Sequence, residues 1–167
     1  MVNLAKNFAI NAHGGQLYGQ LPYSVHLDTV VALLVPYGQE AQVIGYLHDV
    51  VEDTPMTVAE ISEKFTPFIS RCVDLLTDEP GETRKERKGK TYARLSKVEG
   101  DEQLALIVKT ADRLANVSAS IKDGNEKLLT MYISEHPLFQ SSVYRLGLCE
   151  PLWIELNNLI GSQQTTQ

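Results

Sequence analysis

The chain has 167 residues, of which 43% are hydrophobic and 22% charged, and its formal net charge is −6. This length suits one domain with a proper core, and the negative charge argues against a broad nucleic-acid or anionic-membrane surface, because both need basic surfaces. Cys72 and Cys149 lie far apart in the sequence and are expected to be reduced thiols. Neither a signal peptide nor an apolar run of about 18 residues appears, so the expectation is a cytoplasmic protein without a membrane span.

Apolar residues recur at helical spacing along nearly the whole chain, and strand-like alternation is absent. The pattern predicts one all-α domain, a bundle of about seven to nine helices over residues 1–160, followed by a polar tail at 161–167. Pro137 and the segment from Gly147 to Pro151 are expected to separate the last helices. In chain order, the expected helices cover 2–13, 24–35, 39–51, 57–65, a segment that starts at Thr66-Pro67, a long run from Asp101, and then 125–135, 138–147 and 150–160.

The segment 45–54, "GYLHDVVEDT", carries four ionisable side chains between apolar flanks. Buried carboxylates need compensation, either from a salt-bridge network or from a metal ion. On one helix His48 would share a face with Glu52, and Asp49 with Asp53. The segment contains no basic partner for a salt bridge. The pattern therefore favours a metal ion.

Two further polar residues interrupt apolar helical faces. His26 lies among apolar neighbours, and Asp112 breaks the face of the long helix, with Asn116 one turn later. Taken singly, His26 fits a core or surface histidine, and Asp112 fits a salt bridge to Lys109 or Arg113. Taken together with His48 and Asp49, they supply two imidazoles and two carboxylates, a set that suits Mn, Fe, Co or Zn better than Ca or Mg. A mixed site with water in its vacant positions is typical of catalytic metals.

The order of these residues, H…HD…D, resembles that of the HD-domain metal-dependent phosphohydrolases. The further pieces "AHGGQ" (12–16), "PYSVH" (22–26), "LHDVVEDT" (47–54), "ERK" (86–88) and "KTADRLAN" (109–116) resemble the hydrolase domain of the RelA/SpoT group, and the length resembles the stand-alone small alarmone hydrolases. Members of this group degrade guanosine 3′,5′-bis(diphosphate). The resemblance spans residues from about 4 to 135.

The resemblance implies a role for each matching position. It implies that Mn²⁺, or another divalent transition metal, is held by His26, His48, Asp49 and Asp112. It implies that Glu52 and Asp53 handle the attacking water and proton transfer, and that Asn116 contacts the nucleotide. The expected partner is a small-molecule nucleotide rather than a nucleic acid, and the sequence leaves a homo-oligomer open.

Other positions depart from the family pattern or match it singly. The loop "GQLYGQLPY" is one residue shorter than in many relatives and lacks their Arg-Lys pair, so Tyr18 is a candidate for stacking on the base or for plain packing. Arg84, from the run "RKERKGK", is a candidate phosphate ligand, although such a run is often a solvated helix face. Tyr132 matches a tyrosine beside the family's pocket, or is a boundary residue. His13 and His136 are expected to be structural.

Three functions remain open at this point. The first is hydrolysis of the 3′-pyrophosphate of an alarmone, with the guanosine compound and its adenosine analogue both allowed by the altered loop. The second is an HD phosphohydrolase acting on another phosphorylated nucleotide. The third, a metal-binding regulatory module without turnover, is disfavoured because it would have no use for Glu52 and Asp53.

Overall fold

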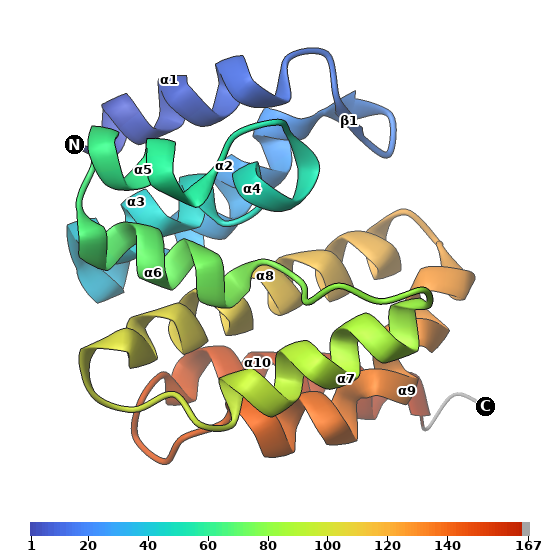
Figure 1. Ribbon diagram of the computed structural model, residues 1–167. Coiled ribbons are helices and arrows are strands. Elements are labelled where there is room, and N and C mark those ends of the chain that lie inside the picture. The colour runs from blue at the N-terminus through green and yellow to red at the C-terminus, as the bar shows by residue number, and fades with distance from the viewer. Residues whose placement is uncertain (165–167) are drawn as a thin grey trace.

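The computed structural model describes residues 1–164, and they form the expected all-α bundle (Figure 1). Within this range eight α-helices have ten or more residues, in line with the predicted seven to nine. They are α1 (Val2–His13), α2 (Tyr23–Leu34), α3 (Gly38–Leu47), α6 (Pro67–Leu76), α7 (Arg84–Leu95), α8 (Gln103–Lys122), α9 (Glu126–Val143) and α10 (Glu150–Gln164). Two short helices, α4 (Val50–Asp53) and α5 (Val58–Lys64), and two 3₁₀ turns (Val35–Tyr37 and Gly100–Glu102) complete the helical elements.

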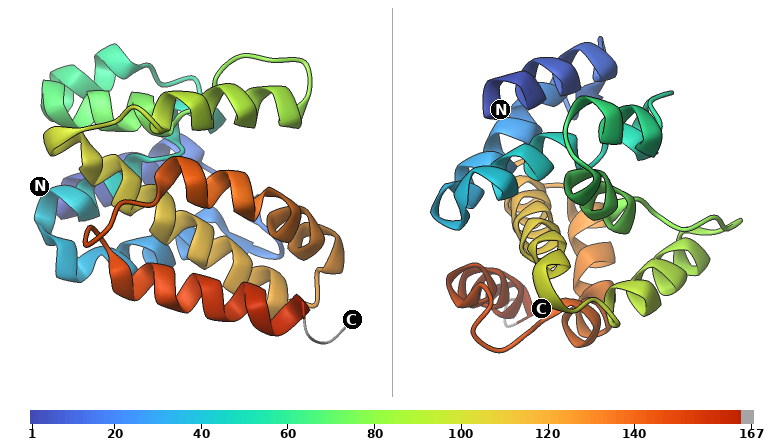
Figure 2. Two further views of the ribbon diagram at one scale, coloured as in Figure 1. Left: turned by 90° about the horizontal axis from the view of Figure 1, so that it is seen from below. Right: turned by 60° about the vertical axis from the view of Figure 1, so that its left-hand side comes forward.

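Helix α8 runs through the middle of the bundle (Figure 2) and contacts α2, α3, α6, α9 and α10. It is buried on most sides, as expected for a central helix whose apolar residues are not confined to one stripe. Ala105, Leu106, Val108 and Ala111 have no exposed surface. Because α2 and α3 pack directly on α8, polar residues from these three helices can meet in the interior.

Local capping explains where several helices begin. Thr57 and Glu60 form a capping box at α5, with the Thr57 backbone N–H donating to Glu60 Oε2 at 2.8 Å. Thr66 accepts from the backbone N–H of Ile69 at 3.1 Å, and Pro67 opens α6. Both starts agree with the sequence patterns.

The predicted helix over 39–51 is wrong in one respect: it breaks at His48 and Asp49. Helix α3 ends at Leu47, and α4 begins at Val50 after a turn in which Asp49 adopts φ −103° and ψ −2°. The prediction that the apolar residues around this segment are buried is confirmed, since Ile44, Leu47 and Val50 are fully buried. The turn replaces the expected continuous stacking of His48 on Glu52 and of Asp49 on Asp53.

The prediction that Pro137 separates two helices is wrong. Helix α9 continues through this proline to Val143. A proline inside a helix removes one backbone hydrogen bond and costs roughly 3 kcal/mol. Phe139 and Val143, which follow it, are fully buried. Burial of this last part of α9 outweighs the local cost, and His136 lies in the helix rather than in a turn.

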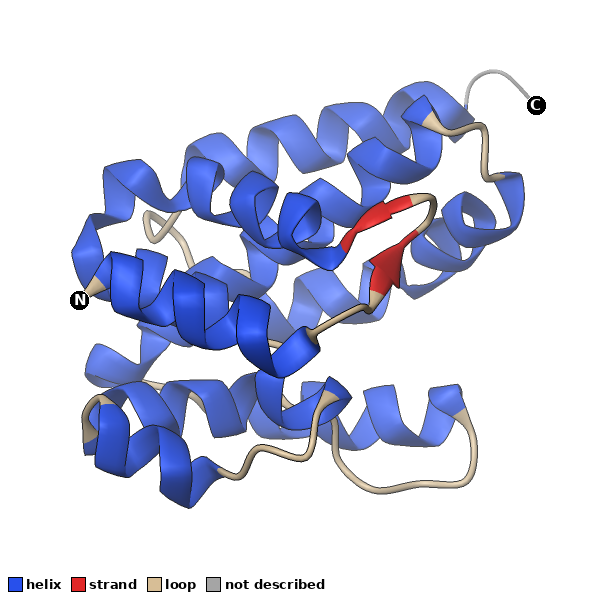
Figure 3. Cartoon of the chain, turned by 90° about the horizontal axis from the view of Figure 1, so that it is seen from above, coloured by secondary structure: helices blue, strands red, loops and turns tan. Residues whose placement is uncertain are grey.

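A small two-stranded hairpin joins α1 to α2 (Figure 3), although the sequence showed no strand pattern. Strand β1 (Leu17–Tyr18) pairs antiparallel with β2 (Leu21–Pro22), with Tyr18 opposite Leu21. Gly19 in the connecting turn has a φ of +61°, a conformation that glycine adopts without steric cost. The hairpin is too short to be recognised from alternation.

The C-terminal helix extends further than predicted. Residues 161–164, assigned to the polar tail, belong to α10, and the remaining tail residues 165–167 lie outside the described residues. Cys72 and Cys149 are free and buried, as expected. None of the described helices combines the length and apolar character needed to cross a membrane.

Candidate active site

His48 presents one ring nitrogen to the interior. Its Nδ1 lies 2.7 Å from the backbone oxygen of Gly45, so Nδ1 carries the proton and donates it, which leaves Nε2 as the free position. His48 is 1% exposed, and within residues 1–164 its Nε2 has no hydrogen-bond partner. A buried imidazole whose Nδ1 is held by a carbonyl, and whose Nε2 is directed at carboxylates rather than at a fixed donor or acceptor of the backbone, has the arrangement of a metal ligand.

Three candidate ligands converge there, His26 from α2 and His48 and Asp49 from the turn that follows α3. Ligand atoms of His26, His48 and Asp49 lie within 4.8 Å of one another. The Nε2 atom of His48 is 2.9 Å from Asp49 Oδ2, and Nε2 of His26 is 3.9 Å from the same oxygen. The donor set of two imidazoles and a carboxylate fits a divalent transition metal.

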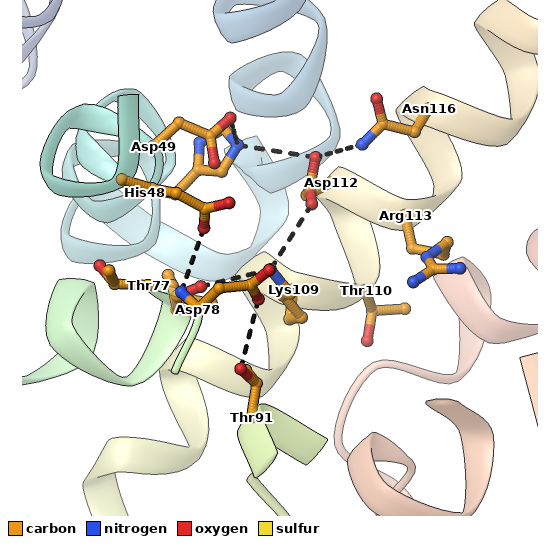
Figure 4. Close-up of polar contacts among 12 residues, drawn as sticks. His48, Asp49, Thr77, Asp78, Thr91, Lys109, Thr110, Asp112, Arg113 and Asn116 are labelled. Carbon is orange, nitrogen blue, oxygen red and sulfur yellow. Dashed lines mark hydrogen bonds and ion pairs between the residues drawn. The ribbon is translucent and has the colours of Figure 1, made fainter. Parts of the chain in front are cut away.

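Asp112, from α8, completes the group. Its Oδ1 lies 3.3 Å from His26 Nε2 and 3.6 Å from His48 Nε2. The same oxygen accepts a hydrogen bond of 2.6 Å from Asn116 Nδ2 (Figure 4). The salt bridge considered from the sequence is long, with Lys109 Nζ 3.9 Å from Asp112 Oδ2. The structure thus brings all four sequence-predicted ligands together.

The two aspartates dominate the electrostatics of this group. Burial would lower the pKa of His48, but Asp49 and Asp112 together hold it well above its ordinary value. Burial would raise the pKa of Asp112, yet hydrogen bonds with His26 and His48 hold it well below its usual range. The buried carboxylates therefore stay ionised and attract a cation, and a metal ion can fill that role in place of the His48 proton.

Glu52 and Asp53 lie at the rim of the same cavity and differ in environment. Glu52 Oε2 accepts from the backbone N–H of Asp78 at 3.1 Å, and burial raises the pKa of its carboxyl, opposed by Lys109 and reinforced by Asp78. Asp53 is fixed by a hydrogen bond of 2.8 Å from Gln16 Nε2. A raised pKa suits Glu52 to holding and releasing a proton.

Four basic side chains line the same cavity as His26, Asp49 and Asp112, which has a volume of about 200 Å³. We call this set the basic wall: Arg84, Lys88, Lys109 and Arg113. Lys88 pairs with Asp78 at 2.8 Å, whereas Arg84 and Arg113 both pair with Glu135, at 2.7 and 3.1 Å. The cavity therefore combines candidate metal ligands with cationic side chains.

The predicted substrate residues lie in or beside this cavity, and their contacts with a substrate remain predictions. Asn116, Arg84 and Tyr132 line it, and Arg113 lies over the Tyr132 ring at 4.8 Å from its centroid. Tyr18 lines a neighbouring cavity of about 530 Å³. Its hydroxyl donates to Asn116 Oδ1 at 2.7 Å.

Sequence reasoning missed most of the basic wall. Lys88, Lys109 and Arg113 stood within the quoted motifs "ERK" and "KTADRLAN", but no binding role was assigned to any of them. The available sequence signal was that Lys109 and Arg113 fall within the periodic run of the long helix, where the structure leaves them 5% and 4% exposed. Two cations in an otherwise apolar helical run indicate a polar cavity beside it.

The two remaining histidines lie outside the cluster of candidate ligands, and their structural role stays a prediction. His13 Nδ1 lies 2.9 Å from Gln16 Oε1, and its ring stacks on Tyr23 at 4.4 Å. His136 Nε2 lies 2.8 Å from Asn157 Oδ1.

The fold is thus an all-α bundle in which two buried histidines and two half-buried aspartates form a group of side chains that could hold a metal ion. No protein-family model matches the chain. It is 27% identical over 151 residues to the guanosine-3′,5′-bis(diphosphate) 3′-pyrophosphohydrolase of Aquifex aeolicus (strain VF5), covering 88% of the chain and 22% of that protein. It is 32% identical over 123 residues to the GTP pyrophosphokinase rsh of Brucella ovis, covering 70% of the chain and 16% of that protein.

Two solved structures share the fold. One, described as a metazoan orthologue of SpoT that hydrolyses ppGpp, has a TM-score of 0.82 at 21% identity, covering 97% of this chain and 94% of its own. Another, lmo0812 from Listeria monocytogenes EGD-e, has a TM-score of 0.69 at 25% identity, covering 84% and 96%. The curated relatives confirm the similarity to the RelA/SpoT group indicated by the sequence motifs, and the solved structures confirm the fold. The chain spans about a fifth of the length of the curated relatives it matches.

Proposed function

We propose that this domain is a metal-dependent phosphohydrolase that removes the 3′-pyrophosphate of an alarmone nucleotide and releases pyrophosphate. The observation that carries the proposal is the cavity that His26, Asp49 and Asp112 line together with the basic wall. The carboxylates and imidazoles suit a cation, and the basic side chains suit a multiply charged anion. The relatives named as 3′-pyrophosphohydrolases support the reaction class.

We assign the four residues of the cluster as ligands of Mn²⁺, with other divalent transition metals as alternatives. When bound, the ion would polarise a phosphoryl oxygen and lower the pKa of water toward neutrality. The chain's own residues then have separate tasks. Gly45 fixes the His48 tautomer through its carbonyl, and Asn116 orients Asp112 by donating to Oδ1.

Glu52 is the proposed proton carrier. Its raised pKa lets it take a proton from the attacking water and return it to the leaving 3′ oxygen. Asp53, held by Gln16, would orient the water as a hydrogen-bond acceptor. Within residues 1–164 neither Glu52 nor Asp53 forms a salt bridge, so both carboxylates remain available to bind water.

The basic wall would bind the phosphates. Arg113 Nη1 is buried and has no hydrogen-bond partner within the described chain, so it offers a donor to an anionic ligand. Lys109 is also buried, and beside the long contact to Asp112 its Nζ donates only to the backbone oxygen of Leu76, at 3.3 Å. Guanidinium and ammonium groups that are desolvated in this way interact strongly with phosphate.

A nucleotide panel tests this proposal. The purified protein is incubated with Mn²⁺ and the guanosine alarmone, its adenosine analogue, and nucleotides without a 3′-phosphate. We expect pyrophosphate to be released from at least one of the two alarmones and from none of the other nucleotides. Orthophosphate from the other nucleotides would support the alternative of a different HD phosphohydrolase, and no turnover of any compound by a metal-loaded protein would support a binding module.

A further inference from the structure

Tyr18 connects the short hairpin to the metal-binding cluster by two different contacts. Its hydroxyl donates to Asn116 Oδ1 at 2.7 Å, across 98 positions of the sequence. Its ring stacks on the His26 ring, with centroids 4.5 Å apart and planes inclined by 12°. The hairpin thereby contacts the cluster through both α2 and α8.

The hydrogen bonds form a directed chain from Tyr18 to Asp112. Asn116 Nδ2 donates to Asp112 Oδ1 at 2.6 Å, and an amide nitrogen can only donate. This orientation leaves Asn116 Oδ1, which can only accept, facing away from Asp112. The Tyr18 hydroxyl supplies the donor that this oxygen needs.

The two contacts act on two different proposed ligands. Stacking restricts the rotation of the His26 imidazole, whose Nε2 faces Asp112 at 3.3 Å. The hydrogen-bond chain fixes the rotation of the Asp112 carboxylate through Asn116. Partners of this kind orient metal ligands, and their loss typically costs about 10–100-fold in metal affinity.

We propose that Tyr18 is a positioning residue of the metal centre, which holds His26 and Asp112 in the geometry that binds the ion. The proposal rests on the metal site assigned under the proposed function. The loop "GQLYGQLPY", which departs from the family pattern, thereby has a role in metal binding. Through Tyr18 its hairpin restricts the movement of two ligands, His26 and Asp112, that come from different helices.

The test is the affinity of the metal-free protein for Mn²⁺, measured by isothermal titration calorimetry without nucleotide. Tyr18→Phe removes only the hydroxyl, and we expect it to weaken Mn²⁺ binding by about tenfold. Tyr18→Leu also removes the stacking, and we expect a larger loss. Tyr144→Phe is the matched control, since the Tyr144 hydroxyl donates to Glu150 at 2.7 Å in another part of the fold.

The variant Asn116→Ala and its combination with Tyr18→Phe test the route. Because the hydroxyl acts through Asn116, the double variant should bind Mn²⁺ as weakly as Asn116→Ala alone. Unchanged affinity of Tyr18→Phe, with the wild type binding one ion, would overturn this proposal and leave the metal site intact. Failure of the wild type to bind Mn²⁺ would overturn both.

Discussion

His26 lies in α2 and His48 in the turn directly after α3, yet their ring centroids lie 5.5 Å apart. The close approach of α2 and α3 makes this separation attainable. Gly45 of α3 packs against α2, where a β-carbon would stand 2.5 Å from Leu34 Cδ1 and 3.2 Å from Val31 Cγ2. The absence of a side chain at Gly45 therefore sets the distance between two proposed metal ligands.

Gly45→Ala should destabilise the protein and weaken metal binding. The added methyl group would meet the fully buried Leu34, and overpacking of this kind costs about 1–3 kcal/mol. Gly89→Ala is the control, because Gly89 lies within α7 with open space at its β-carbon, where alanine should add about 1 kcal/mol. Urea unfolding of the two variants should move the midpoint in opposite directions.

His48→Gln should abolish tight metal binding while the fold persists. The substitution removes the one nitrogen that is buried and unpaired in the centre of the cluster. The loss should exceed the roughly 10–100-fold typical of an indirect partner. Elemental analysis after dialysis measures the bound metal, and His136→Gln, remote from the cluster, should retain it. Full occupancy in His48→Gln would remove this residue from the ligand set.

Glu52→Gln should separate metal binding from turnover. The amide keeps the size and can still accept from Asp78, but it cannot take up a proton. We expect bound metal to remain while kcat falls by about 10²–10⁴-fold. Steady-state kinetics on metal-loaded protein measure this change, and a variant with wild-type kcat would show that Glu52 is not the proton carrier.

Arg84→Met should raise KM for the alarmone more than it lowers kcat. Arg84 lines the cavity and is held there by Glu135, so its loss removes a phosphate contact rather than a reacting group. Lys85→Met is the matched control, since Lys85 makes the same charge change on the exposed side of α7. Equal KM values for the two variants would place the phosphates elsewhere.

His136 should make stability depend on pH. Burial lowers its pKa, Arg113 lowers it further, and the Asn157 hydrogen bond only partly opposes this. Since the folded pKa lies below the unfolded value of about 6.5, the unfolded chain binds the proton first. Stability is therefore retained above pH of about 6.5 and lost as the pH falls below it. His136→Gln should reduce that loss, measured by urea unfolding between pH 7.5 and 5.5, and an unchanged slope would contradict it.

Features set by neighbouring residues could be predicted from the sequence. The capping box at Thr57, the Thr66-Pro67 start and the buried face of Ile44 and Leu47 depend on local chemistry and helical period. The four candidate ligands were predictable because each places a polar group in an apolar helical face, which needs an explanation.

Features set by tertiary packing could not be predicted. The turn at His48 and Asp49 and the continuation of α9 through Pro137 depend on what packs against them, since burial of Phe139 outweighs a local penalty. The inward orientation of Lys109 depends on a cavity that several helices form together. The hydrogen bond from Tyr18 to Asn116 joins two segments that no local pattern connects.

One time course decides whether the metal cluster and the basic wall together hydrolyse an alarmone. Purified protein is incubated with Mn²⁺ and guanosine 3′,5′-bis(diphosphate), and samples quenched with a chelator are analysed by phosphorus NMR. We expect pyrophosphate and the 5′-diphosphate to appear in equal amounts over many turnovers, and this turnover to be lost when the metal is chelated beforehand and in His48→Gln. An unchanged alarmone spectrum, with Mn²⁺ bound to the protein, would contradict it.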